Sequence, residues 1–217
     1  MEKYPLRYRQ EGDVIMPQFA IDSIYRLSKD RDPIITVDVG QHQMWAAQFC
    51  RTRLPNRFIS SSGLGTMGYG VPAAMGAQFG KPDELVLTIV GDGGFQMTVQ
   101  ALTTGVEFKQ PFKVYIVNNG YLGMVRQWQD LFYRHRYSEV DLRAGNPDFA
   151  KLAEAYGCHG IRVTRPDLLE TAIRRSLELN DRPVVVDIMV SEEENVYPMI
   201  PSGMTIHDMI IEAPHRK

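Results

Sequence analysis

The chain has 217 residues, of which 44% are hydrophobic and 23% are charged, and its formal net charge is -2. These values suit a soluble globular domain with one sizeable core, and they exclude the basic surface that nucleic-acid binding requires. No apolar run could cross a membrane and no secretory signal opens the chain, so we expect a cytoplasmic protein without membrane partners. Cys50 and Cys158 lack metal-site spacing, and we expect both to be reduced thiols. The charge balance also predicts no nucleic-acid partner.

The first part of the chain alternates helical and extended patterns. Residues 1–16 have no hydrophobic period, and we interpret them as a linker from a missing upstream domain. Pro17 suits the first turn of a helix, and the apolar run that ends in Asp38-Val39-Gly40 has the character of a buried parallel strand. The predicted elements are a helix over 19–27, a strand over 34–37, a helix over 41–50, a weak strand over 57–60, a glycine-rich loop over 60–70 and a helix over 71–79.

The centre of the chain has the pattern of strand, helix and strand. Apolar runs cover 85–90 and 112–117, and each ends in a polar loop. Between the two runs lies a helical pattern with Met97, Leu102 and Val106 near one face.

The remaining residues continue the alternation. The predicted elements are a helix over 123–133, a polar and candidate mobile loop over 134–145, a helix over 149–156 begun by Asn146-Pro147-Asp148, a strand over 160–163, a helix begun at 165–167 and a strand over 183–190. This order predicts the α/β class, with a doubly wound, mostly parallel sheet and helices on both faces. The domain would span 17–191, and residues 192–217 would form a tail that wraps the domain or closes its site.

Two polar side chains stand where the central strands end. Asp92 lies between two glycines after the first strand, and Asn119 follows the second. An Asp-Gly pair alone is often only a turn. One strand–helix–strand crossover separates this pair, however, which places both loops at the carboxyl edge of a parallel sheet. A carboxylate and an amide oxygen suit Mg²⁺ that holds a phosphate group.

A second glycine-rich motif is Gly63-Leu64-Gly65-Thr66-Met67-Gly68. It fits the dinucleotide fingerprint and would indicate a dinucleotide-dependent oxidoreductase that binds NAD. We disfavour this interpretation because the preceding strand pattern is weak and a better phosphate site follows. On burial preferences alone, Met67 would be a core methionine.

The run Gly91-Asp92-Gly93, followed after a spacer by Asn118-Asn119, resembles the diphosphate-binding signature of enzymes that use thiamine diphosphate (ThDP). The resemblance implies the ThDP-binding fold, with Mg²⁺ bound by Asp92, Asn119 and the backbone carbonyl of Tyr121. It further implies that the amides of Gly93 and Gly94 approach the diphosphate. The backbone at Gly65 and Met67 would contact the aminopyrimidine, and the Met67 side chain would prop ThDP in its bent shape.

Two further runs resemble the catalytic subunits of acetohydroxyacid synthases (acetolactate synthases). The first is the 39–48 run, which contains Gly40-Gln41-His42. In that family Gln41 and His42 would contact the diphosphate, and Gly40 would lie at the cofactor. The second is the 121–133 run, which taken alone is an amphipathic helix with aromatic core contacts, although its interleaved polar residues suit a lid. Here Gly123, Met124 and Val125 would pack near the cofactor rings and Trp128 would line the substrate channel. Residues 194–199 resemble that family's closing segment.

The resemblance implies decarboxylation of pyruvate and transfer of the hydroxyethyl unit to a second 2-ketoacid, in branched-chain amino-acid biosynthesis. The family's activating glutamate lies on a separate pyrimidine-binding domain without a counterpart here, so we assign no catalytic residue to this chain and expect it to be inactive alone. A homo-oligomer or partner chain would supply that domain, and a regulatory subunit is possible. The family's FAD would not bind this chain.

Two alternatives stay open. One is another ThDP carboligase or decarboxylase, of the pyruvate oxidase or glyoxylate carboligase type. The other is a non-catalytic ThDP- and Mg²⁺-binding assembly module.

Overall fold

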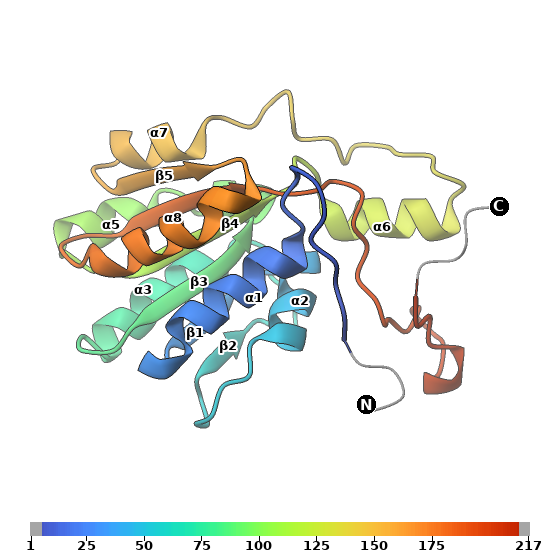
Figure 1. The fold of residues 1–217 in the computed structure, drawn as a ribbon, viewed down its shortest axis with the longest axis horizontal. Coiled ribbons are helices and arrows are strands. Elements are labelled where there is room, and N and C mark those ends of the chain that lie inside the picture. Colours follow the sequence, from blue (N-terminus) through green and yellow to red (C-terminus); the bar gives the residue numbers. More distant parts are fainter. Residues whose placement is uncertain (1–5, 213–217) are drawn as a thin grey trace.

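The computed structural model describes residues 6–212, and its centre is a six-stranded parallel sheet (Figure 1). The strand order is β2-β1-β3-β4-β6-β5. The strands are β1 (Ile34–Val37), β2 (Phe58–Ser60), β3 (Val86–Gly91), β4 (Lys113–Asn118), β5 (His159–Val163) and β6 (Val184–Met189).

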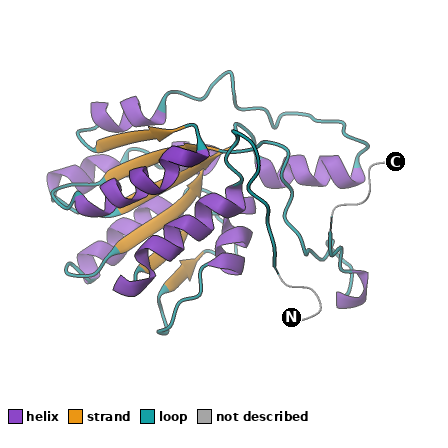
Figure 2. Ribbon diagram, viewed as in Figure 1, coloured by secondary structure: helices purple, strands orange, loops and turns teal. Residues whose placement is uncertain are grey.

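Helices cover both faces of this sheet (Figure 2). One face carries α1 (Pro17–Ser28), α2 (Gln41–Phe49) and α8 (Pro166–Glu178). The other carries α3 (Gly70–Gly80), α5 (Ala101–Glu107) and α7 (Phe149–Ala155). Two helices, α4 (Asp92–Met97) and α6 (Gly123–Phe132), follow the carboxyl ends of β3 and β4. Short 3-10 turns occupy Lys29–Arg31 and Ile206–Asp208. The predicted fold class is confirmed.

Alternation along each strand divides the core into two apolar layers. Ile35 and Leu87 pack on the α1 and α8 face, whereas their neighbours Ile34 and Val86 pack on the α3 and α5 face. Because helices cover both faces, both sets of side chains are buried, which explains why these strands are continuous apolar runs.

The single helix predicted after β3 is wrong, because the chain forms two short helices there. The first, α4, ends at Met97, and α5 begins at Ala101. Between them, the Thr98 hydroxyl donates a 2.9 Å hydrogen bond to the Gly68 carbonyl of the glycine-rich loop. Met97 therefore leaves the face it was predicted to share with Leu102: its side chain is 56% exposed, while Leu102 is fully buried.

The strand order creates a crevice between β1 and β3. From β1 the chain moves outward to β2, and it then returns to the other side of β1 through β3. The connections after these two neighbouring strands therefore leave the sheet in opposite directions. Ligands of doubly wound proteins bind at such a switch point, at the carboxyl ends of the strands.

The segments outside the sheet pack against it. Residues 6–16 form no helix or regular strand, yet Ile15 is fully buried and makes a parallel bridge with Val190 at the end of β6. In the tail, Val196 is also fully buried. Both cysteines are buried and free. No helix in residues 6–212 is long and apolar enough to span a bilayer.

Candidate cofactor site

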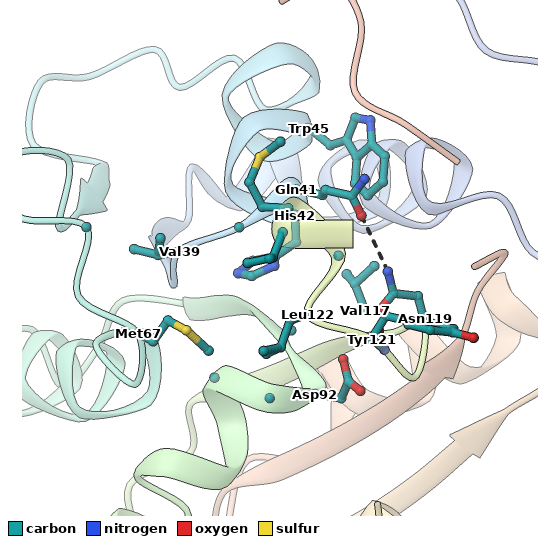
Figure 3. Close-up of a pocket in the computed structure, with 18 residues that line it drawn as sticks. Val39, Gln41, His42, Trp45, Met67, Asp92, Val117, Asn119, Tyr121 and Leu122 are labelled. Atoms are coloured by element: carbon teal, nitrogen blue, oxygen red, sulfur yellow. Dashed lines mark hydrogen bonds between the residues drawn. The ribbon is translucent and has the colours of Figure 1, made fainter. Parts of the chain in front are cut away.

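A pocket opens at the carboxyl edge of the sheet, over the crevice between β1 and β3 (Figure 3). Its walls come from the ends of β1 and β3, the first turn of α2, the glycine-rich loop and the start of α6. Every residue predicted to bind the cofactor lines it, namely Gly40, Gln41, His42, Gly65, Met67, Asp92, Gly93, Gly94, Asn119, Tyr121, Gly123, Met124 and Val125. The pocket thus joins motifs that lie far apart in the sequence.

Asp92 is the first residue of α4 and lines the pocket below Asn119 and Tyr121 in Figure 3. Its side chain is almost fully buried, and this burial raises the pKa of the carboxyl to about 6. The backbone amide of Gly93 and the side-chain amide of Asn146 oppose that rise. Asn146 Nδ2 donates to Asp92 Oδ2 at 2.6 Å. A buried carboxylate with only neutral donors around it is a favourable place for a cation.

Asn119 and Tyr121 lie on the loop after β4, beside Asp92. β3 and β4 are adjacent strands, with Gly91 in register with Val117, so their loops meet at one edge. Asn119 Oδ1 accepts a 3.0 Å hydrogen bond from the Tyr121 amide, which tightens the loop. Gly120 between them has a φ of 72°, a conformation that favours glycine.

Gln41 joins this loop to α6. Its Oε1 accepts a 3.4 Å hydrogen bond from Asn119 Nδ2, drawn as the dashed line in Figure 3. Its Nε2 donates to Gln127 Oε1 at 2.9 Å and to the Glu194 carbonyl at 3.0 Å. A Cβ on Gly123 would stand 2.2 Å from Gln41 Oε1 and 2.7 Å from Asn119 Nδ2, so a larger residue there would displace both side-chain amides.

His42 is held between backbone segments. A Cβ on Gly40 or on Gly91 would stand 3.1 Å from its Cε1 atom, so the imidazole packs closely on both loops. The ring nitrogen Nε2 is buried and has no hydrogen-bond partner within the described residues. Burial lowers the pKa of His42 to about 3, which keeps the ring neutral. An orphaned neutral imidazole at a pocket wall can donate one hydrogen bond to a ligand.

Asp38, at the end of β1, anchors the glycine-rich loop that carries Met67. The Gly68 amide donates to Asp38 Oδ1 at 2.9 Å, and the Val39 amide donates to the same oxygen at 2.8 Å. A Cβ on Gly94 would stand 2.1 Å from Asp38 Oδ2. The fully buried Asp38 thus packs against both the glycine-rich loop and α4, and Met67 projects into the pocket.

The start of α6 forms part of the pocket wall, and Trp128 lies beyond it. Met124 and Val125 line the main pocket. Trp128 instead lines an adjoining hollow with Val125, Tyr133 and Arg136. The aromatic core contacts considered for this helix are wrong, because its one buried residue is Gln127.

Sequence reasoning missed three polar residues. Asp38 could have been found, because it ends a strand as Asp92 does. Asn146 was considered only as part of the helix start Asn146-Pro147-Asp148, and that start is confirmed, because the N-cap of α7 is Asp148, which accepts from the Lys151 amide. Gln127 had no signal of its own, because a glutamine on an amphipathic helix is ordinarily exposed.

Residues 38–188 match the family model described as thiamine pyrophosphate enzyme, C-terminal TPP binding domain. The chain belongs to this family. The matched range begins at Asp38, directly after β1, and ends within β6, so it contains every predicted cofactor-binding residue. The predicted resemblance to ThDP enzymes is therefore confirmed.

The chain is also similar to acetolactate synthase large subunits. It is 49% identical to that of Corynebacterium glutamicum, over 95% of this chain and 34% of the relative. It is 44% identical to the acetolactate synthase isozyme 2 large subunit of Escherichia coli K12, over 96% of this chain and 38% of the relative. It is also 44% identical to the acetolactate synthase large subunit of Porphyra purpurea, over 99% of this chain and 36% of the relative. The chain spans about a third of the length of the curated relatives it matches.

Proposed function

We propose that this chain forms the diphosphate- and Mg²⁺-binding part of an acetolactate synthase, which decarboxylates pyruvate and joins the two-carbon unit to a second 2-ketoacid. The observation that carries the proposal is the convergence of Asp92 and Asn119 at the ends of adjacent strands, within one pocket that also contains His42 and Met67. The similarity to acetolactate synthase large subunits supports this activity over that of other ThDP carboligases.

The donor atoms fit a hard divalent cation. Within the described residues, no group of three or more histidine, cysteine, aspartate or glutamate side chains could hold a metal, so a cation would depend on mixed oxygen donors. Asp92 supplies a carboxylate, Asn119 an amide oxygen and Tyr121 a backbone carbonyl. Mg²⁺ takes few protein ligands and completes its octahedron with phosphate oxygens and water, which suits this set.

Other residues would hold the cofactor in place. When bound, ThDP supplies the nucleophilic carbon that attacks the keto group of the substrate. His42 would donate a hydrogen bond to the diphosphate through Nε2, which has no partner within the described residues. Gln41 would contact the diphosphate from the same wall, although its Nε2 already donates to Gln127 and to the Glu194 carbonyl. The amides of Gly93 and Gly94 would approach the same region. Met67 and Val125 would give the rings an apolar support that excludes water.

The pocket lacks an acid that could activate the cofactor pyrimidine. Among its lining residues, Asp92 is the only carboxylate, and that group is committed to the metal. We infer that the activating glutamate comes from a pyrimidine-binding domain on a second copy of a longer chain or on a partner chain. The complete site is then an interface between domains, and no FAD site is proposed for this chain.

Titration calorimetry of the chain with ThDP, with and without Mg²⁺, tests the binding role. We expect binding that depends on Mg²⁺ and that the Asp92→Ala variant loses. Binding by this variant equal to that of the unaltered chain would contradict the metal assignment. Circular dichroism of both proteins controls for misfolding.

Product analysis tests the catalytic role. The isolated chain with pyruvate, ThDP and Mg²⁺ should form no acetolactate, and addition of a protein that bears the pyrimidine-binding domain should restore it. Robust turnover by the chain alone would refute the inferred missing glutamate. A different product after addition would identify another carboligase, and binding without any turnover would favour a non-catalytic assembly module.

A further inference from the structure

Asn146 makes the only side-chain hydrogen bond to Asp92 from the described part of the chain. Its Nδ2 donates to Asp92 Oδ2 at 2.6 Å, a short distance for a bond to a carboxylate. Its Oδ1 accepts from Gln96 Nε2 at 2.8 Å. Because an ionised carboxylate can only accept, the donor end of Asn146 must face Asp92, and its oxygen is then turned toward Gln96.

The segment that carries Asn146 is also tied to the other proposed metal loop. The Leu142 amide donates to the Gly120 carbonyl at 2.8 Å, and the Leu122 amide donates to the Val140 carbonyl at 2.9 Å. The Asn146 amide in turn donates to the Leu142 carbonyl at 2.9 Å. The connection from α6 to α7, which crosses above the sheet in Figure 1, therefore links the loop after β4 to the side chain of Asp92.

Asn146 reaches Asp92 from outside the pocket. It lines a separate small hollow with Gly120, Arg143 and Asp148, and it is absent from the walls of the main pocket. It therefore binds Asp92 Oδ2 from the side opposite the main pocket and does not occupy the space where a ligand would bind. A residue in this place can set the direction of the carboxylate and need not touch metal or cofactor.

We propose that Asn146 is a positioning residue that orients the Asp92 carboxylate for Mg²⁺ and, through Gln96 and the 140–146 segment, keeps the two metal-ligand loops in register. This inference rests on the proposed function. Mg²⁺ demands near-ideal octahedral geometry, whereas Ca²⁺ accepts flexible coordination. Loss of the hydrogen bond that orients Asp92 should therefore weaken the binding of Mg²⁺ much more than the binding of Ca²⁺.

The test uses Asn146→Leu, which keeps the size of the side chain and removes its donor. Mg²⁺ and Ca²⁺ are titrated separately at saturating ThDP, with tryptophan fluorescence as the signal because Trp45 lines the pocket. We expect half-saturation by Mg²⁺ to need about 10- to 100-fold more cation. The requirement for Ca²⁺ should change less than about threefold because its coordination adapts.

Matched variants separate positioning from folding. Gln96→Leu should weaken Mg²⁺ binding by a smaller factor than Asn146→Leu does. Gln100 is also an exposed glutamine, four residues further on, and Gln100→Leu should leave Mg²⁺ binding unchanged. Thermal unfolding without ligands shows whether each variant is folded.

The outcomes distinguish this inference from the function it rests on. Unchanged Mg²⁺ affinity in Asn146→Leu, or equal losses for Mg²⁺ and Ca²⁺, would overturn the positioning role while leaving the cofactor site intact. If the unaltered chain showed no cation-dependent ThDP binding, the proposed function would fail and this inference with it.

Discussion

Helices α1 and α6 are both amphipathic, but α1 buries apolar side chains in the core and α6 buries none. The 12-residue α1 places Ile21 and Ile24 in the apolar core against the sheet. The 10-residue α6 buries Gln127 and leaves Val125 and Phe132 almost half exposed. Dispersion and the hydrophobic effect therefore hold α1, whereas directed hydrogen bonds hold α6 at the rim of the pocket.

The contacts of Gln127 account for this inversion. Its Oε1 accepts from the Val196 amide at 2.8 Å and its Nε2 donates to the Val196 carbonyl at 3.1 Å, so it pairs with the tail as a strand would. Arg126 Nη1 adds a 2.6 Å bond to the Glu192 carbonyl. A helix held in this way leaves its apolar face free for a ligand or another domain, which a core helix cannot do.

The largest expected effect is on the α1 side. Ile21→Ala removes a fully buried side chain from the core and should lower the free energy of unfolding by about 2–5 kcal/mol. Chemical denaturation measures this. A loss below about 1 kcal/mol would show that α1 is not packed as described.

The next effect is a pH dependence of the free energy of unfolding that comes from His42. The unfolded chain keeps the ordinary His42 pKa of 6.5, and burial lowers it to about 3 in the fold. The unfolded state therefore binds more protons between these values, and stability is lost as pH falls through that window. The free energy of unfolding of the unaltered chain, relative to His42→Leu, should fall by about 3 kcal/mol from pH 7 to pH 4. Parallel pH profiles would refute a buried neutral His42.

A smaller effect is expected from Gln127→Leu. This change keeps the volume but leaves the Val196 amide and carbonyl without their partner, at a cost of about 1–3 kcal/mol. The tail should detach before the sheet unfolds, so limited proteolysis within residues 192–199 should accelerate. Gln129→Leu, on the same helix, should not change this cleavage, because Gln129 bonds to Ser138 instead. Equal cleavage in both variants would contradict the role of Gln127.

The smallest effect is expected from Val125→Ala on α6. The side chain is 47% exposed and adds little to the core, so the free energy of unfolding should change by no more than about 0.5 kcal/mol. A loss comparable to that of Ile21→Ala would mean that the apolar face of α6 is covered, and the contrast between the two helices would disappear. Denaturation at several protein concentrations would reveal a second copy as the cover.

Local patterns in the sequence were enough to predict most of the fold. β1 was predicted with its observed bounds, and β3 and β4 were each displaced by one residue. Continuous apolar runs identify strands covered on both faces, and parallel strand ends must share an edge, so Asp92 and Asn119 could be brought together without coordinates. Pairing of the motif loops with a family signature then predicted the residues that line the pocket.

The tertiary structure alone decided the contacts between distant segments. Asn146 beside Asp92, Gln127 beside Val196 and Asp38 beside Gly68 each join parts of the chain that no local pattern relates. The break between α4 and α5 depends on the Thr98 bond to the Gly68 carbonyl in the same way. The spacing of apolar residues predicts which side chains are buried. It does not predict which polar group a buried amide or carboxylate will bind. The sequence by itself therefore determined the sheet and the chemistry at its edge, while packing decided how that chemistry is held.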